Sequence, residues 1–120
     1  MAKVLEQESV ITSDACGWPE AEQVIARYAF DLAYQRETAT ILQSVRQTTQ
    51  NLDDLNTAWQ LHDFLSARRH DLDGKYDFRL SSLIFVLARL VKEGWLEVGD
   101  LQGLTADKVA KITSLSRMLP

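Results

Sequence analysis

The stretch LNTAWQLHDFLSARRHDL, residues 55–72, decides the fold, because its apolar stripe at heptad spacing is interrupted twice by ionisable side chains. The apolar positions are Leu55, Ala58, Leu65 and Leu72. His62 and Arg69 occupy the remaining two positions, and this spacing puts all six on one side of a helix. An unpaired guanidinium is costly to bury, so Arg69 must find an acid, stay at a wet rim or bind a partner. Each option indicates an interface.

The composition fits one soluble domain. The chain has 120 residues, of which 46% are hydrophobic, and its 17 acidic against 13 basic side chains argue against a nucleic-acid partner. The single cysteine, Cys16, cannot form an internal disulfide, which fits a reducing cytoplasm. Residues 1–10 lack the apolar core of a signal peptide, and no run of apolar residues is long enough to span a membrane.

Helical periodicity dominates the first two thirds of the chain. We expect a flexible N-terminal arm over residues 1–17 and a single helical domain over residues 18–120. A long helix is expected from about residue 19 to 48, with Pro19 at its first position. Asp53 is a plausible N-cap for a second helix over residues 55–72, and Gly74 offers a break.

The remaining chain predicts shorter and more apolar helices. A third helix is expected from about Tyr76 to Glu93, with Gly94 as its C-terminal cap. Thr105 can cap a last helix, after an apolar connection that has room for a short helix. No alternating pattern supports a strand, so the predicted class is all-α.

The two long helices should form an antiparallel hairpin, a stalk over residues 18–74, beside a compact helical head over residues 75–120. A hairpin alone leaves apolar area uncovered, so we expect a homodimer packed through the long helices about a two-fold axis. The residues of the apolar stripe expected at this dimer interface are Leu55, Ala58 and Leu65.

The sequence gives little support for a catalytic site or a metal site. The pairs His62-Asp63 and His70-Asp71 resemble those of metal-dependent phosphohydrolases, but adjacent helical residues point about 100° apart. The chain has only two histidines, and no histidine lies near Cys16 in the sequence. We therefore expect no catalytic residue, no metal and no cofactor.

A mixed patch surrounds the ionisable positions. Trp59 and Asp63 lie four residues apart, beside the stripe that holds His62 and Arg69. Aromatic and arginine side chains are enriched in interface hot spots, which favours binding. A structural alternative stays open, in which Trp59 is core, Asp63 is solvated and Arg69 completes an internal ion pair. Phe85 lies seven residues after Phe78, away from the leucine face of its helix, where an exposed aromatic ring could also serve binding.

A longer pattern carries a family resemblance. Residues 59–79, WQLHDFLSARRHDLDGKYDFR, are followed by LIFV at 83–86 and KEGWL at 92–96, and then by DLQGL at 100–104 and DK at 107–108. Over about residues 20–118 the chain closely resembles the fluorescence recovery protein family of cyanobacteria. It departs from the family at Ala58, where other members carry a larger apolar residue.

The resemblance implies a small, dimeric, non-enzymatic photoprotection regulator. Such proteins bind the photoactivated orange carotenoid protein through its C-terminal domain, speed its return to the orange form and help detach it from the phycobilisome. The family's functional patch matches Trp59, His62, Asp63 and Arg69, and its second contact region matches Phe85 and Lys111. The resemblance also implies that Trp59, His62 and Asp63 belong to the dimer interface. A cytoplasmic protein, peripheral at the thylakoid membrane, is implied, with no nucleic-acid or small-molecule partner. A homodimeric scaffold or adaptor and a metal-dependent hydrolase stay open as alternatives.

Overall fold

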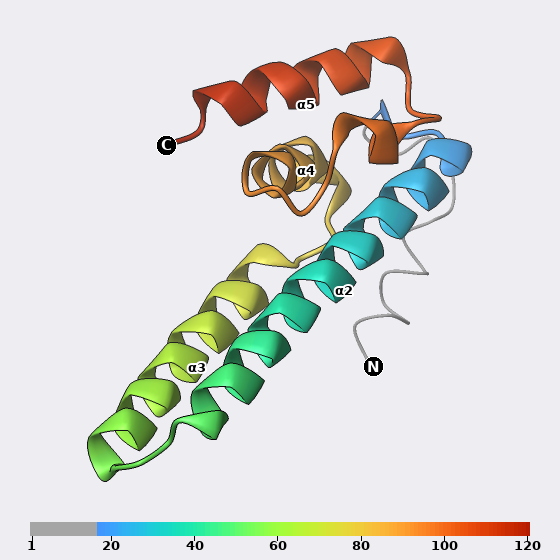
Figure 1. Ribbon diagram of the computed structural model, residues 1–120. Helices are drawn as coiled ribbons and strands as arrows, with labels where there is room; N and C mark the ends of the chain where they lie inside the picture. The colour runs from blue at the N-terminus through green and yellow to red at the C-terminus, as the bar shows by residue number, and fades with distance from the viewer. Residues whose placement is uncertain (1–16) are drawn as a thin grey trace.

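A computed structural model describes residues 17–120, which form a helical hairpin and a helical head (Figure 1). The expected arm over residues 1–17 lies, apart from Gly17, outside the described residues. The described α-helices are α2 (Glu20–Gln50), α3 (Leu55–Lys75), α4 (Leu83–Lys92) and α5 (Ala106–Met118), and the 3-10 helices are η2 (Leu80–Ser82) and η3 (Val98–Leu101). The predicted all-α class is confirmed. No helix within these residues is long and apolar enough to cross a membrane.

Helices α2 and α3 form the predicted antiparallel hairpin, which projects from the head in Figure 1. The cap of α3 is Asp54, whose carboxylate accepts the backbone N–H and the hydroxyl of Thr57, each at 2.8 Å. The prediction of Asp53 as the cap is therefore wrong by one residue. A cap binds the amide three residues ahead, and at Asp54 that residue is Thr57, which offers a second donor.

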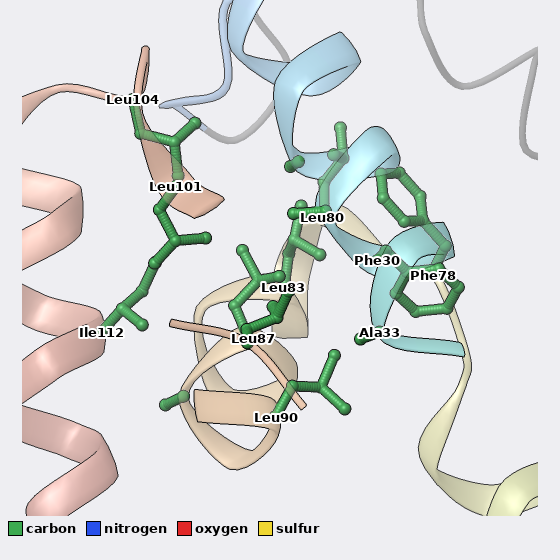
Figure 2. Packing of buried hydrophobic residues seen from close by; sticks show 14 of the residues in the cluster. Phe30, Ala33, Phe78, Leu80, Leu83, Leu87, Leu90, Leu101, Leu104 and Ile112 are labelled. Carbon is green, nitrogen blue, oxygen red and sulfur yellow. The ribbon is translucent and has the colours of Figure 1, made fainter. Parts of the chain in front are cut away.

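The head is built around α4, whose leucines Leu83, Leu87 and Leu90 are fully buried. Figure 2 shows them between two groups of side chains. Ile112 of α5 and Leu101 of η3 lie on one side, and Phe30 of α2 and Phe78 lie on the other. Burying a leucine side chain contributes roughly 1.5–3 kcal/mol, so these three leucines are a main source of the stability of the head.

The first half of α2 is part of this head core. Ala26, Ala29 and Ala33 are fully buried, and Phe30 is 5% exposed. Small alanine side chains let a neighbouring element approach closely, and the Phe30 ring packs against the rings of Tyr76 and Phe78. One continuous helix therefore runs from the head into the stalk (Figure 1).

The segment between α3 and α4 differs from the prediction. The third helix begins at Leu83 rather than near Tyr76, because Tyr76 and Phe78 each pack edge-on against Phe30 with ring centres 5.3 Å apart. Residues 76–79 are not helical. The expected break at Gly74 is also wrong, since α3 continues to Lys75. The C-terminal cap at Gly94 is confirmed by its φ of 85°.

Glu22 ties the beginning of α2 to the beginning of α5. Its carboxylate accepts the Thr105 backbone N–H and the Lys108 ammonium, both at 2.8 Å. Thr105 in turn accepts the Lys108 backbone N–H at 3.3 Å, which confirms it as the cap of α5. Gly103 has a φ of 106°, and a Cβ there would lie 2.5 Å from Cδ1 of Ile25. This connection therefore requires glycine.

A buried ion-pair network joins the stalk to the head. The Lys75 ammonium, with its side chain 1% exposed, lies 2.7 and 2.8 Å from the two Glu37 oxygens and 2.6 Å from Glu93. The Tyr76 hydroxyl donates to Glu37 at 2.7 Å. Arg89 of α4 completes the network. Its guanidinium lies 2.8 Å from the carboxylate of Glu93, just after α4, and 2.9 Å from the carboxylate of Asp71 on α3.

The network perturbs the acid–base equilibria of its members. Burial alone would raise the pKa of Glu93, but hydrogen bonds from Lys75 and Arg89 outweigh burial and hold the pKa below its usual 4.5. Burial would also raise the pKa of Asp71, but Lys75 and Arg89 outweigh burial and hold this pKa below 3.8. Burial would lower the pKa of Lys75, but Glu37 and Glu93 raise it above 10.5.

These directions predict a stability window. A lowered carboxyl pKa stabilises the fold above the unfolded-state pKa, and this stabilisation is lost as the pH falls below about 4.5 for Glu93. The raised Lys75 pKa stabilises the fold below 10.5 and ceases to do so as the pH rises further. Urea unfolding midpoints at pH 7, 5 and 3.5 should therefore fall on the acid side.

Glu93→Gln is the matched variant for this measurement. It should lower the midpoint at pH 7, and its difference from the unsubstituted chain should shrink as the pH falls to 3.5, because the stabilisation from the lowered Glu93 pKa is lost progressively as the pH falls below the unfolded-state pKa. An equal difference between the two proteins at both pH values would contradict the assignment.

Candidate functional site

The predicted patch lies on the exposed surface of the stalk. We define the stalk patch as Trp59, His62, Asp63 and Arg69, all on α3. Trp59 is 57% exposed, and its ring centre lies 6.1 Å from that of His62 at an interplanar angle of 89°. His62 Nδ1 lies 3.3 Å from the Asp63 carboxylate. The structural alternative that made Trp59 a core residue of the single chain is therefore wrong.

Arg69 is exposed and takes part in none of the ion pairs of residues 17–120. Asp63 lies six residues earlier, about 9 Å along the helix axis. The structure brings Trp59, His62 and Asp63 together but leaves Arg69 further along the same helix. The guanidinium is thus available, within the described chain, to an acidic group of another molecule.

Most of the apolar stripe of α3 is open to solvent in the single chain, and Leu72 at its C-terminal end packs against the head core. Leu55 is 67% exposed and Leu65 is 37% exposed, while Ala58 is half-buried. The one residue of α3 that is buried is Lys75. A helix that buries none of its apolar side chains fully in its own fold is typical of an interface.

Several exposed apolar side chains of the stalk escaped the sequence prediction, namely Leu42, Leu52 and Phe64, at 48%, 42% and 38% exposure. Phe64 lines a groove of about 230 Å³ between α2 and α3, together with Leu61, Ser44 and Thr48. The signal that could have indicated Phe64 is its spacing of three from Leu61, beside the stripe rather than on it.

Phe85 and Lys111 lie together in the head. They line one cleft of about 430 Å³ between α4 and α5, which we call the head cleft. Phe85 is 59% exposed, and the Lys111 ammonium lies 3.2 Å from Asp107. This cleft combines an open aromatic ring with a cation that an exposed, weak ion pair leaves accessible. Such a pair suits a protein surface that offers an apolar side chain beside an acidic one.

Met118 was also missed, although it lines the head cleft and is 77% exposed. Lys111, Leu115 and Met118 are spaced by four and three residues along α5, so they follow one helix face. This spacing could have indicated from the sequence that Met118 lies on the same helix face as Lys111. A flexible thioether at the rim of a cleft adapts to different partner surfaces.

Within residues 17–120 no group of three or more His, Cys, Asp or Glu side chains could hold a metal ion. The expectation about Cys16 falls outside the described residues.

Comparison with known proteins identifies one family over nearly the whole described chain. Residues 18–116 match the model of a family described as the photoprotection regulator fluorescence recovery protein. The fluorescence recovery protein of Synechocystis sp. strain PCC 6803 is 46% identical over 101 residues, which cover 84% of this chain and 93% of that protein.

Solved structures are similar as well. The fluorescence recovery protein of Fremyella diplosiphon is 50% identical, with a TM-score of 0.81 that covers 84% of this chain and 99% of that one. The Synechocystis protein has a TM-score of 0.80 at 46% identity, covering 83% of this chain and 98% of that one. The stalk patch lies within the matched residues, and so do Phe85 and Lys111 of the head cleft, whereas Met118 at its rim lies beyond them.

Proposed function

The chain belongs to the fluorescence recovery protein family of photoprotection regulators, and on that premise we propose that it binds the photoactivated orange carotenoid protein through the partner's C-terminal domain. Binding speeds the partner's return to its inactive orange form and helps detach it from the phycobilisome, at the cytoplasmic face of the thylakoid membrane. Quenching then ends and antenna fluorescence recovers. No bond is made or broken by this chain in that role.

One observation carries the proposal: a family match over residues 18–116 that includes a solvent-exposed patch holding a tryptophan and an unpaired arginine. Tryptophan and arginine are the side chains most often responsible for binding energy at protein interfaces. Arg69, placed away from any acid of its own chain, suits a carboxylate of the partner.

A binder accelerates reversion only if it stabilises the transition state of reversion more than the activated state. Two contact regions on one rigid molecule can do this by favouring the partner conformation in which both are engaged at once. The stalk patch and the head cleft are the regions to which we assign these contacts.

We also propose that the protein acts as a homodimer through the stalk. Its radius of gyration is 16.9 Å, against about 13 Å for a globular domain of this size, so the stalk extends well beyond the head. The expected interface residues Leu55, Trp59, His62 and Asp63 are exposed. A second hairpin packed against this face would cover the apolar stripe.

The test of function is dark reversion of the partner, followed by absorbance after photoconversion from orange to red. Substoichiometric amounts of this protein should increase the reversion rate, because a binder that releases the orange form acts repeatedly. An unchanged rate, with a partner from the same organism and a well-folded dimer, would leave a scaffold or adaptor as the function.

In the same assay, Arg69→Leu should remove most of the acceleration while the dimer persists. Removing one partner of a buried, hydrogen-bonded charge pair costs about 2–5 kcal/mol of binding, which is at least about thirty-fold in affinity. Arg79→Leu is the matched control, since Arg79 is exposed and lies between α3 and α4. Retained activity in Arg69→Leu would contradict the role given to Arg69.

Trp59→Ala should weaken the dimer. Truncating an aromatic hot spot costs about 2 kcal/mol or more, so the dissociation constant should rise by about thirty-fold or more. Analytical ultracentrifugation over a concentration series measures this. Tyr28→Ala is the matched control, because Tyr28 is a 71% exposed aromatic residue in the half of α2 that packs in the head. An equal effect of both substitutions would remove Trp59 from the interface.

Lys111→Gln should shift the dose–response curve of reversion to higher protein concentration, without changing the dimer. An exposed charge at an interface rim contributes mainly to association and is screened by salt, so the difference from the unsubstituted chain should shrink at high ionic strength. Lys92→Gln, at the end of α4, is the control. A salt-independent shift would indicate a buried contact instead.

A further inference from the structure

Helix α3 carries the stalk patch, yet its own fold holds it by very little. Of its 21 residues, Lys75 alone is buried; on its apolar stripe Leu55 and Leu65 are exposed, Ala58 is half-buried, and Leu72 near the C-terminal end packs against the head core. At the other end, α3 begins at the exposed cap Asp54. The strongest contacts that fix α3 against the other helices are therefore those of Lys75 and its neighbours at the C-terminal end.

These contacts are directional. The Lys75 ammonium donates to Glu37 of α2 at 2.8 Å and to Glu93 beside α4 at 2.6 Å, and it lies 3.6 Å from Asp71 one turn earlier. Hydrogen bonds weaken steeply when their angle or length changes, whereas apolar contacts tolerate sliding. A rotation of α3 by one residue, about 100°, would take the ammonium away from both glutamates.

A second cation, Arg89, also connects the end of α3 to the head. Arg89 of α4 lies 2.9 Å from Asp71 of α3 and 2.8 Å from Glu93. The end of α3 is therefore held by two cations and three carboxylates from three helices, Glu37, Asp71 and Glu93 being the acids. Arg69 of the stalk patch is six residues from Lys75, about 9 Å along the same helix.

We propose that Lys75 is a positioning residue, which sets the rotation and axial position of α3 so that the stalk patch and the head cleft face one partner together. This inference rests on the proposed function for its consequence, but not for its geometry. A displacement of about 1 Å in a positioned group can cost about a hundred-fold in rate, so small errors in α3 should matter.

Positioning and stability can be separated at this site. A buried ion pair is weak evidence for stability, because apolar residues of similar volume often replace it at no cost, while removing one partner alone leaves a buried charge. Lys75→Met leaves Glu37 without its cation. Tyr76→Phe, Glu37→Leu and Lys75→Met together remove both charges and the hydroxyl that donates to Glu37, and Asp71 and Glu93 keep Arg89.

The experiment measures a distance within one chain. Spin labels at Ala67→Cys on α3 and Arg117→Cys on α5, both exposed positions, are placed in a Cys16→Ser background. Excess unlabelled protein makes intrachain pairs dominate in a dimer. Ala67 lies two residues from both Leu65 and Arg69, on the helix side away from the stripe. Lys92→Met is the control for an exposed lysine of α4.

The triple variant should unfold at a midpoint close to that of the unsubstituted chain, yet its distance distribution should be broader or displaced, and its affinity for the partner at least about ten-fold weaker. Lys92→Met should change none of these. An unchanged distribution in both Lys75 variants overturns the inference, and so does a changed distribution with unchanged affinity. If the unsubstituted chain itself fails to bind or accelerate, the proposed function is at fault, and the distances alone still decide whether Lys75 positions α3.

Discussion

Helix α2 belongs to two parts of the molecule, and this shared use constrains the rest. Its first half places Ala26, Ala29 and Phe30 in the head core, while its second half is one strut of the stalk. A helix of 31 residues is about 46 Å long, and no proline or glycine interrupts it. The direction of the stalk is therefore fixed by packing inside the head. Helix α3 takes its position from α2 and from the ion pairs of Lys75.

Local signals predicted the elements whose ends are set by local chemistry. Thr105 and Gly94 were read correctly because a hydroxyl cap and a left-handed glycine act on their own backbone. The start of α4 could not be read in this way. Tyr76 and Phe78 continue an apolar helical pattern in the sequence, but their rings are drawn onto Phe30, 46 and 48 residues earlier, so tertiary packing overrides the local preference.

In the candidate site, too, local patterns in the sequence predicted some residues, and tertiary packing decides the rest. The open stripe of α3 was predicted from the ionisable residues on it, and the family was predicted from residues 59–79, which the comparisons confirm. The meeting of Phe85 and Lys111 depends on how α4 packs against α5, so no spacing revealed it. Lys75 was missed altogether, because a lysine beside aspartates reads as a solvated helix end, and its main acid, Glu37, is 38 residues away.

The charges on the stripe place two demands on one helix. A fully apolar seam would make the tightest dimer, but an exposed apolar helix invites unspecific association before it finds its copy. Exposed groups such as His62 and Asp63 reduce that risk, and in a two-fold interface they favour one register, since like charges brought together cost energy. Such groups add little net stability to a seam, so in the proposed dimer the binding energy would come from Trp59 and the leucines beside it. Because those apolar contacts tolerate sliding, they do not fix the position of α3 within its own chain, and the directional bonds of Lys75 at its far end are suited to fix it.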